Sequence, residues 1–418
     1  MPSWRRTLAF MVGAQFGTAL GFSFFHPFLP LYVRQLGSTT GLGVELLSGL
    51  VFSGQAVTMA ILSPIWGAVA DRYGRKPMVI RASLGSAVTV LLMGLAQSAE
   101  QLIGLRIVQG LVSGTISASA ALVASVTPRE NCGYAMGMLQ VGLWSGVAAG
   151  PLVGGVLSDL AGFRVTFAVT SLVLLLVAVG VWIGVDEPFV RSQQVQSGTF
   201  GFLMDWRRVL SSRWLDFTLA LRFLSALGRS TLEPVLPLFV LALAGSVAGV
   251  GTSTGLVVGA ASVATTATSV WLGRLGDRVG HGRVALASGI GTAIFLGASA
   301  LAQTVWQLLV LHALAGACVG GLLPSLSALL AEYSKSGDEG CVYGIDSSMT
   351  SAGRAVGPLL GAACAFWLSV RMTFAITGLV FVAASALGAF TVCRPSLDHR
   401  RSRHAAADLD EKRRLDRQ

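Results

Sequence analysis

The sequence predicts an all-α polytopic membrane protein whose chain crosses the bilayer twelve times, with its helices in two pseudo-symmetric halves of six. Three observations predict this fold class. Only 12% of the 418 residues are charged and 53% are hydrophobic, whereas soluble globular proteins carry about 25% charged residues. Twelve runs of the chain are apolar enough to span a membrane, and the second half of the sequence repeats features of the first.

The apolar runs give the number of crossings. A helix that crosses the hydrocarbon layer, roughly 30 Å thick, needs about 20 mostly apolar residues. The runs that satisfy this are 8–33, 43–70, 78–97, 101–125, 134–157, 163–185, 214–242, 252–273, 284–302, 305–330, 341–366 and 371–393. We expect the first run to be retained, because it is too long for the apolar region of a signal peptide and lacks a small-residue cleavage site. The even number of runs places both termini on one side.

Basic residues indicate which side that is. With a cytoplasmic N-terminus, 23 of the 30 Lys and Arg residues lie at the cytoplasmic face, counting those at the ends of runs, and three lie at the opposite face. The remaining four lie inside the membrane, at Arg106, Arg222, Arg229 and Arg354. Cytoplasmic loops of membrane proteins carry this excess of positive charge. We therefore expect a multi-pass protein of the bacterial inner membrane with both termini in the cytoplasm. The net charge of +10 is spread over these loops, which favours contact with anionic lipid headgroups over binding of nucleic acid.

An internal repeat divides the chain. Residues 26–33 resemble 233–240, residues 146–154 resemble 353–361, and residues 163–170 resemble 370–377, each at an offset of 207. The sequence therefore predicts an N-terminal half at 1–185, a cytoplasmic linker at 186–213, a C-terminal half at 214–393 and a cytoplasmic tail at 394–418. Six crossings per half give both halves the same orientation, with a cavity between them, which is an architecture for alternating access.

Three segments of the N-terminal half carry recognisable motifs. They are the loop at 67–76, which is rich in glycine and basic residues, the stretch 102–110 inside the fourth run, and the glycine-rich stretch 142–155 in the fifth. Together with the twelve-span repeat, they resemble motifs A, B and C of the major facilitator superfamily. The resemblance covers about residues 5–395. Within the superfamily, segments 27–37, 63–71 and 93–97 resemble enterobacterial multidrug efflux proteins.

The resemblance implies roles for individual residues. Motif A corresponds to Gly67, Asp71, Arg72, Gly74 and Arg75, and its aspartate is expected to make a contact between the halves that locks one face. Motif B corresponds to Arg106, a position tied in the superfamily to proton coupling. Motif C corresponds to Gly142, Gly146, Gly150, Pro151 and Gly154, and it marks the drug:proton antiporters. The second copy of motif A, at 273–283, is degenerate.

The glycines of the fifth run also have a plain structural interpretation. Gly142, Gly146, Gly150 and Gly154 recur every four residues, so they form a ridge of small residues that lets a neighbouring helix approach closely. Pro151 is expected to kink this helix. Packing alone explains the spacing, and a close interface that also seals one side of the protein is compatible with it.

Ionisable residues inside the runs are costly, and they usually face a cavity or a partner. In the seventh run, Thr218, Arg222, Ser225, Arg229 and Glu233 fall on one helical face. We expect a substrate pathway that includes Gln15, His26, Arg222, Arg229 and Arg354. Arg229 and Glu233 are spaced to pair as i and i+4, and this pair is either a buried tether or part of transport.

Proton coupling is assigned to Arg106, Glu233 and Asp346. A carboxyl group in a partly wet, apolar site can exchange protons as access alternates. Glu233 and Asp346 are the candidate carriers, although Asp346 lies near the start of the eleventh run and is equally a gate or helix-start residue. His26 is more simply explained as a packed or hydrogen-bonded histidine than as a proton relay.

The functional expectation is a monomeric, proton-coupled secondary transporter that exports small amphiphilic molecules, as multidrug efflux proteins do. The alternative is a dedicated exporter of an endogenous metabolite such as a siderophore, and the arginines inside the runs favour an anionic cargo. No P-loop sequence is present, so the proton gradient is the expected energy source, with no cofactor and no metal. Five cysteines without metal-ligand or redox spacing indicate neither a disulfide framework nor a zinc site. No catalytic cluster points to an enzyme.

Overall fold

The structure is a computed structural model that describes residues 3–128, 131–185, 187, 213–246, 248–333 and 339–392. Every element in these ranges is helical. The elements are α1 (Ser3–Phe25), η1 (His26–Phe28), α2 (Leu29–Leu36), α3 (Val44–Tyr73), α4 (Arg75–Gly94), α5 (Ala99–Val112), α6 (Thr115–Val126), α7 (Cys132–Gly184), α9 (Arg213–Thr231), α10 (Leu236–Ala244), α11 (Val250–Val279), α12 (His281–Ser299), α13 (Val305–Tyr333), α14 (Glu339–Trp367) and α15 (Val370–Val392).

These elements make the twelve expected crossings. The first crossing consists of α1, η1 and α2, the fourth of α5 and α6, and the seventh of α9 and α10. Helix α7 holds the fifth and sixth crossings, because Gly162 at φ 80° breaks it in the middle. The fourth crossing was expected to be one helix, but it is interrupted at Gly114, whose φ of 126° is accessible to glycine at little cost. The expected all-α, twelve-helix fold is confirmed.

The outer surface of the protein is apolar. Within the described ranges, nine helices are long and apolar enough to cross a membrane by length and composition alone, one of which contains the two crossings of α7. Large side chains face outward on several of them, including Leu160, Trp271 and Trp306, which are 83%, 81% and 71% exposed. Soluble monomers rarely expose large contiguous apolar patches. The outer surface of this fold therefore suits a hydrocarbon environment.

The sequence repeat appears in the backbone. The first crossing is broken at His26 and the seventh at Leu232–Val235, at equivalent positions of the two halves. Two matching aromatic contacts stabilise the halves: the rings of Tyr32 and Phe167 lie 5.0 Å apart, and those of Phe239 and Phe374 lie 4.9 Å apart. Both pairs are buried in the core of their own half. Each half therefore has an apolar core of its own.

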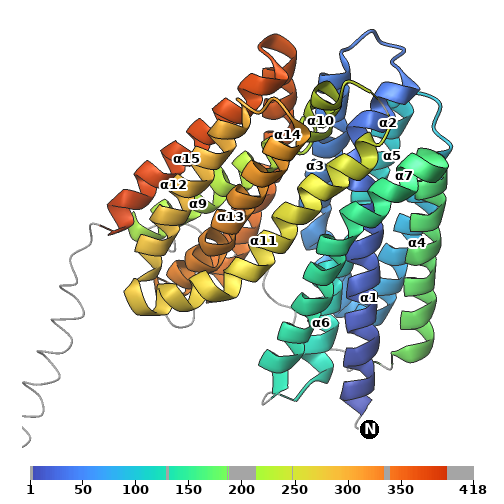
Figure 1. The fold of residues 1–418 in the computed structure, drawn as a ribbon. Coiled ribbons are helices and arrows are strands. Elements are labelled where there is room, and N and C mark those ends of the chain that lie inside the picture. Colours follow the sequence, from blue (N-terminus) through green and yellow to red (C-terminus); the bar gives the residue numbers. More distant parts are fainter. Residues whose placement is uncertain are drawn as a thin grey trace, which may run out of the picture.

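Figure 1 shows the two halves side by side, with the N-terminal half in blue to green and the C-terminal half in yellow-green to red. We call the face where α1 begins the N-terminal face and the opposite one the far face. The halves touch through α7 with α11 and through α3 with α14. Their ribbons meet towards the far face and diverge towards the N-terminal face.

A clip at the far face joins α5 to the loop before α3. The Glu100 Oε1 atom accepts hydrogen bonds from the hydroxyl groups of Ser38 and Thr40, both at 3.0 Å, and from the amides of Thr39 and Thr40 at 3.0 and 3.1 Å. Hydrogen bonds from its own main-chain amide and from Thr40 and Ser38 hold the pKa of the Glu100 carboxyl well below its ordinary value. The carboxylate form therefore organises this loop.

The clip predicts a pH effect on stability. Because the folded-state pKa is lowered, the contribution of Glu100 to stability is complete above its ordinary pKa of 4.5 and is lost as the pH falls below that value. We expect Glu100→Gln to lower the Tm at neutral pH and to reduce the further loss of Tm on acidification. Thermal unfolding of both proteins at neutral and acidic pH measures this, and an unchanged acid dependence would contradict it.

Candidate functional site

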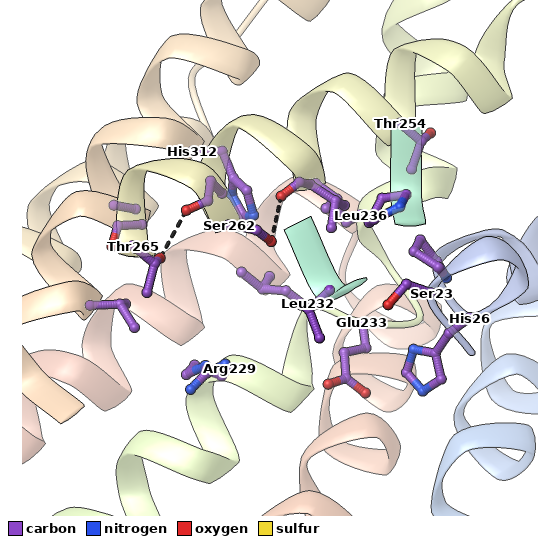
Figure 2. A pocket seen from close by; sticks show the side chains of 18 of the residues that line it. Ser23, His26, Arg229, Leu232, Glu233, Leu236, Thr254, Ser262, Thr265 and His312 are labelled. Carbon is purple, nitrogen blue, oxygen red and sulfur yellow. Dashed lines mark hydrogen bonds between the residues drawn. The ribbon is translucent and has the colours of Figure 1, made fainter. Parts of the chain in front are cut away.

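A cavity of about 460 Å³ lies between the two halves. Apolar side chains such as Phe22, Leu143 and Phe381 form much of its wall, with the hydroxyl groups of Thr254, Ser262 and Thr265 among them. Figure 2 shows His26 from the N-terminal half and Glu233 from the C-terminal half reaching into it. An apolar wall with a few polar groups is typical of sites for small organic ligands.

Both cavity-lining segments are places where the helix is interrupted. His26 begins η1, directly before Pro27, and Glu233 lies in the turn between α9 and α10, directly before Pro234. Proline cannot donate the next helical hydrogen bond and clashes with the preceding turn, so it opens the helix at these positions. The two interruptions place a titratable side chain from each half at the cavity.

The charged lining consists of Arg229, Glu233 and Arg354. Both arginines are exposed to the cavity, and Glu233 is half-buried. The expected ion pair between Arg229 and Glu233 does not form, because α9 ends at Thr231 and the chain turns before Glu233. Glu233 interacts electrostatically with both of these arginines and with Arg106 of the other half. It is therefore a single carboxylate among three guanidinium groups.

Arg106 lies beside the cavity and is 1% exposed. Its Nε atom donates to the carbonyl oxygen of Val51 at 3.2 Å and its Nη1 atom to Gln109 Oε1 at 2.6 Å. Its Nη2 atom is buried without a hydrogen-bond partner. A buried guanidinium group with one open donor and no adjacent carboxylate is costly, so Arg106 is poised to accept an acidic partner.

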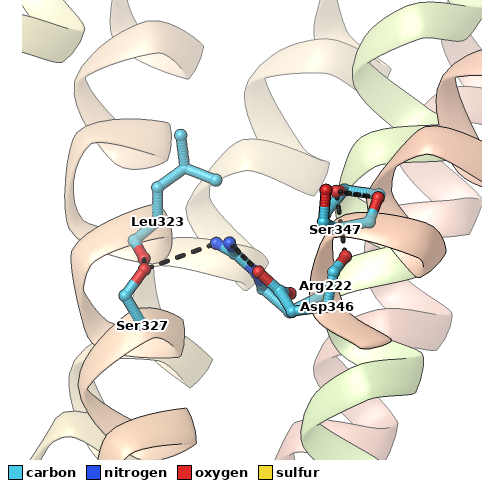
Figure 3. A network of polar contacts seen from close by, with 6 residues as sticks. Arg222, Leu323, Ser327, Asp346 and Ser347 are labelled. Carbon is cyan, nitrogen blue, oxygen red and sulfur yellow. Dashed lines mark hydrogen bonds and ion pairs between the residues drawn. The ribbon is translucent and has the colours of Figure 1, made fainter. Parts of the chain in front are cut away.

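Arg222 and Asp346 form a separate, partly buried ion pair in the C-terminal half (Figure 3). The Nε and Nη2 atoms of Arg222 each donate to one carboxylate oxygen of Asp346, both at 2.6 Å. The Nη1 atom of Arg222 also donates to Ser327 Oγ at 3.5 Å. This bidentate arrangement ties α9, α13 and α14 together. Neither Arg222 nor Gln15, both expected on the substrate pathway, lines the cavity between the halves.

Close contacts at two glycines, Gly49 and Gly155, close the far face. A Cβ atom on Gly49 of α3 would lie 2.9 Å from the Pro358 carbonyl oxygen of α14. A Cβ atom on Gly155 of α7 would overlap the carbonyl oxygen of Gly251 of α11. Close backbone approach of this kind is possible only without side chains. The cavity is therefore covered on its far side by two tight helix pairs.

These features agree with comparisons with known proteins. The family model of the Major Facilitator Superfamily matches residues 11–250 and 218–415. The chain belongs to the major facilitator superfamily. It is 36% identical over 382 residues to the multidrug resistance protein MdtG of Enterobacter lignolyticus (strain SCF1), covering 90% of both chains. It is 37% identical over 382 residues to MdtG of Serratia proteamaculans (strain 568), covering 90% of this chain and 92% of the relative.

The fold also matches solved transporters. The crystal structure of a bacterial homologue of the human lysosomal transporter Spinster, inward-facing and unoccupied, superposes with a TM-score of 0.74 at 15% identity, over 93% of this chain and 96% of that chain. At this identity the likeness concerns the fold alone. The expected resemblance to the major facilitator superfamily, and within it to MdtG-like proteins, is confirmed.

Motif C of the superfamily packs against α1 within the same half. Cβ atoms on Gly142 and Gly146 would lie 2.7 and 2.6 Å from the carbonyl oxygens of Val12 and Phe16. Further along the same ridge, Gly154 meets the backbone of Phe24. The same stretch also contacts the other half, where the carbonyl oxygens of Ala148 and Pro151 lie against Gly259 and Gly255 of α11. Motif C thus supports packing within one half and closure between the halves at successive positions.

Gly154→Ala tests this packing. The added methyl group would overlap the Phe24 carbonyl oxygen, and overpacking of this kind costs about 1–3 kcal/mol of unfolding free energy. We expect a lower Tm in detergent and reduced transport. Gly137→Ala is the matched control, because Gly137 lies on the same helix and a Cβ atom added there would meet no atom within 4 Å. Equal Tm values for the two variants would rule out the packing role.

Motif A surrounds the turn between α3 and α4. Gly74 ends α3 with φ 98°, a backbone conformation that glycine adopts readily. Arg72 lies with its Cζ atom 5.5 Å from the ring centre of Tyr73. The main-chain amide of Arg75 donates to Glu187 Oε1 at 2.9 Å. The side chain of Asp71 lies outside the described part of the structure, as does the surrounding of Gly67, so the expected lock by Asp71 stays a prediction.

Glu187 is a residue that sequence reasoning missed. Its carboxylate accepts from the amides of Arg75 and Lys76 at the start of α4, at 2.8–3.0 Å. A carboxylate at this position satisfies free amides and complements the helix dipole. Since the capping residue lies 111 positions away in sequence, no local pattern could have identified it.

A second missed residue, Asp159, connects the two halves at the far face. Its Oδ1 atom accepts from the Gly251 amide at 3.0 Å, and its Oδ2 atom accepts from the amide and the hydroxyl group of Thr252, both at 2.6 Å. Asp159 belongs to α7 and caps the first turn of α11 across the interface. This cap must be released whenever α7 and α11 separate.

Asp159→Ala should loosen the far face. Loss of a helix cap costs about 0.5–2 kcal/mol, and about 1 kcal/mol changes a two-state ratio about fivefold. We expect cysteines introduced into the cavity wall to react faster with a membrane-impermeant thiol reagent added at the far face. Asp216→Asn, at an exposed carboxylate on α9, serves as control. Labelling rates equal to those of the parent protein would exclude a role of the cap in closure.

The described residues contain no group of three or more His, Cys, Asp or Glu side chains placed to hold a metal ion. The groups that the cavity offers to a ligand are its apolar wall, its hydroxyl groups and the charges of Arg229, Glu233 and Arg354.

Proposed function

We propose that the protein is a proton-coupled exporter of small amphiphilic molecules, a multidrug efflux transporter that works by alternating access across the bacterial inner membrane. The similarity to MdtG multidrug resistance proteins over 90% of the chain supports efflux, in preference to dedicated export of a metabolite such as a siderophore. The two-half architecture with a central cavity supports alternating access.

The observation that carries proton coupling is the position of Glu233. It is the carboxylate among the charged residues that line the cavity, and it lies at the interruption between α9 and α10. An apolar surrounding favours a neutral carboxyl group, whereas nearby guanidinium groups favour the carboxylate. Arg106 belongs to the other half, so rocking of the halves changes its distance from Glu233. The balance between the neutral and the charged form of the Glu233 carboxyl group changes with that distance. Glu233 can then take up a proton in one state and release it in the other.

Orientation follows from the distribution of basic residues. With both termini in the cytoplasm, the far face is periplasmic and the cavity opens to the cytoplasm. A cargo molecule enters there and competes with the proton for the site at Glu233. Separation of α7 from α11 and of α3 from α14 then exposes the cavity to the periplasm, where a proton replaces the cargo. The protein needs only small-molecule cargo, protons and the bilayer for this cycle.

The charge of the cavity limits the choice of cargo. Four arginines lie inside the crossings, but only Arg229 and Arg354 line the cavity, opposite Glu233. Arg222 is neutralised by Asp346, and Arg106 is buried against Val51 and Gln109. The case for an exclusively anionic cargo is therefore weaker than the arginine count suggests. Neutral and zwitterionic amphiphiles also fit an apolar wall with charges of both signs.

Transport in proteoliposomes tests the proposal. The purified protein is reconstituted, an inward or outward pH gradient is imposed, and the movement of a fluorescent amphiphile is followed together with lumenal pH. We expect cargo to move against the proton flux, and an uncoupler that dissipates the pH gradient to abolish the net movement of cargo. Cargo movement that is insensitive to the pH gradient would overturn proton coupling, and absence of movement for neutral, cationic and anionic probes alike would overturn efflux of amphiphiles.

A further inference from the structure

A second cavity lies on the outside of the N-terminal half, away from the space between the halves. It holds about 510 Å³ between α1 and the second crossing of α7. Its lining is entirely apolar, and Phe10, Phe16 and Leu176 line it while 39%, 38% and 61% exposed. No described residue of the other crossings contributes to it. We call this cavity the α1/α7 groove.

Glycines make the groove. Gly13 on α1 and Gly180 on α7 both line it, and a Cβ atom on either would meet no atom within 4 Å. Tight packing therefore does not explain them, in contrast to Gly17 on the same helix, where a Cβ atom would lie 2.7 Å from a methyl group of Val177. The groove is empty space at the protein surface where two lining residues have no side chain.

Positive charge lies at one end of the groove. Arg6 is exposed one turn before Phe10, with its Cζ atom 6.0 Å from the centre of that ring. No carboxylate of the described residues lies within ion-pair distance of Arg6. At the same end of α7, the Lys76 ammonium group donates to the carbonyl oxygens of Trp182 and Val185 at 2.9 and 2.6 Å. This end therefore complements an anion.

We propose that the α1/α7 groove binds one anionic phospholipid, with an acyl chain in the groove and the phosphate at Arg6. An unbranched hydrocarbon chain can fill a narrow apolar groove that faces the bilayer, and basic groups between helices at a membrane surface hold anionic headgroups. Trp182, 66% exposed beside this end, has the amphipathic ring that suits the headgroup level of a membrane. The charge at one end and the apolar length behind it match the two parts of such a lipid.

Native mass spectrometry of the full-length protein tests the proposal. The delipidated protein receives equal amounts of phosphatidylglycerol and phosphatidylcholine with the same acyl chains. We expect one phosphatidylglycerol to be retained in preference. Arg6→Gln should weaken its retention about fivefold, the effect of about one basic residue at an anionic surface. Arg5→Gln is the control, because the neighbouring Arg5 guanidinium lies over Trp4 instead of Phe10.

Filling the groove tests the acyl-chain site. Gly13→Leu should abolish selective retention, whereas Gly104→Leu, on an equally open and exposed glycine of α5, should leave it unchanged. If Gly13→Leu fails to fold, Gly180→Leu fills the same groove from α7. Equal retention of both lipids by the parent protein would overturn the proposal. Selective retention of phosphatidylglycerol by a variant with a filled groove would overturn it as well. So would a dimer that Gly13→Leu disrupts, because the groove would then bind a second copy of this chain.

Discussion

Glu233→Gln is expected to abolish efflux driven by a pH gradient while leaving the cavity able to bind and exchange cargo. Glutamine keeps the size and hydrogen-bonding capacity of the side chain but cannot take up or release a proton. Since Glu233 is the carboxylate of the charged cavity lining, beside Arg229 and Arg354, its loss removes the group through which proton movement is tied to cargo movement. The measurement is cargo flux in proteoliposomes with and without a pH gradient.

Two further measurements make this expectation specific. Counterflow, in which labelled cargo exchanges for unlabelled cargo without a gradient, should continue in Glu233→Gln. Glu332→Gln, which neutralises an exposed glutamate of α13, is the matched control and should retain gradient-driven efflux. Efflux by Glu233→Gln at the parental rate would remove Glu233 from the coupling mechanism. Loss of counterflow as well would assign Glu233 to cargo binding.

Most of the fold could be predicted because it depends on signals repeated along the chain. Length and hydropathy define the crossings, and the repeat fixes the division into halves without any knowledge of contacts. The interruptions at His26 and Glu233 follow from the prolines beside them. The break at Gly114 was missed, since an isolated glycine is tolerated inside many membrane helices.

The candidate site could be predicted only in part, because its residues are joined by contacts distant in sequence. Arg229 and Glu233 were expected to pair on the assumption of one continuous helix, and the turn after Thr231 separates them. Arg222 shares their helical face in the sequence pattern, yet its side chain turns to Asp346, 124 positions away. The cap by Asp159 on α11 joins the two halves. Periodicity identifies a polar face but not the partner that each side chain meets.

The pairing of Arg222 with Asp346 changes the expected role of this aspartate. The Asp346 carboxylate accepts two hydrogen bonds of 2.6 Å from one guanidinium group, a bidentate, charge-assisted contact that fixes the position of both side chains. Its side chain is 9% exposed and that of Arg222 is 17% exposed, and neither lines the cavity between the halves. We therefore expect Asp346 to be a structural tether of α14 to α9, and Glu233 alone to carry the proton.

Asp346→Asn should accordingly destabilise the protein strongly, whereas replacing both Arg222 and Asp346 should not. Breaking a buried ion pair by removing one charge costs about 3–5 kcal/mol, because the other charge is left uncompensated, while apolar replacement of both partners is often neutral. We expect a large fall in Tm and yield for Asp346→Asn, and Tm and gradient-driven efflux near parental values for Arg222→Met combined with Asp346→Leu. A double variant that folds but no longer couples efflux to the pH gradient would return Asp346 to the proton pathway, because stability alone cannot produce that result.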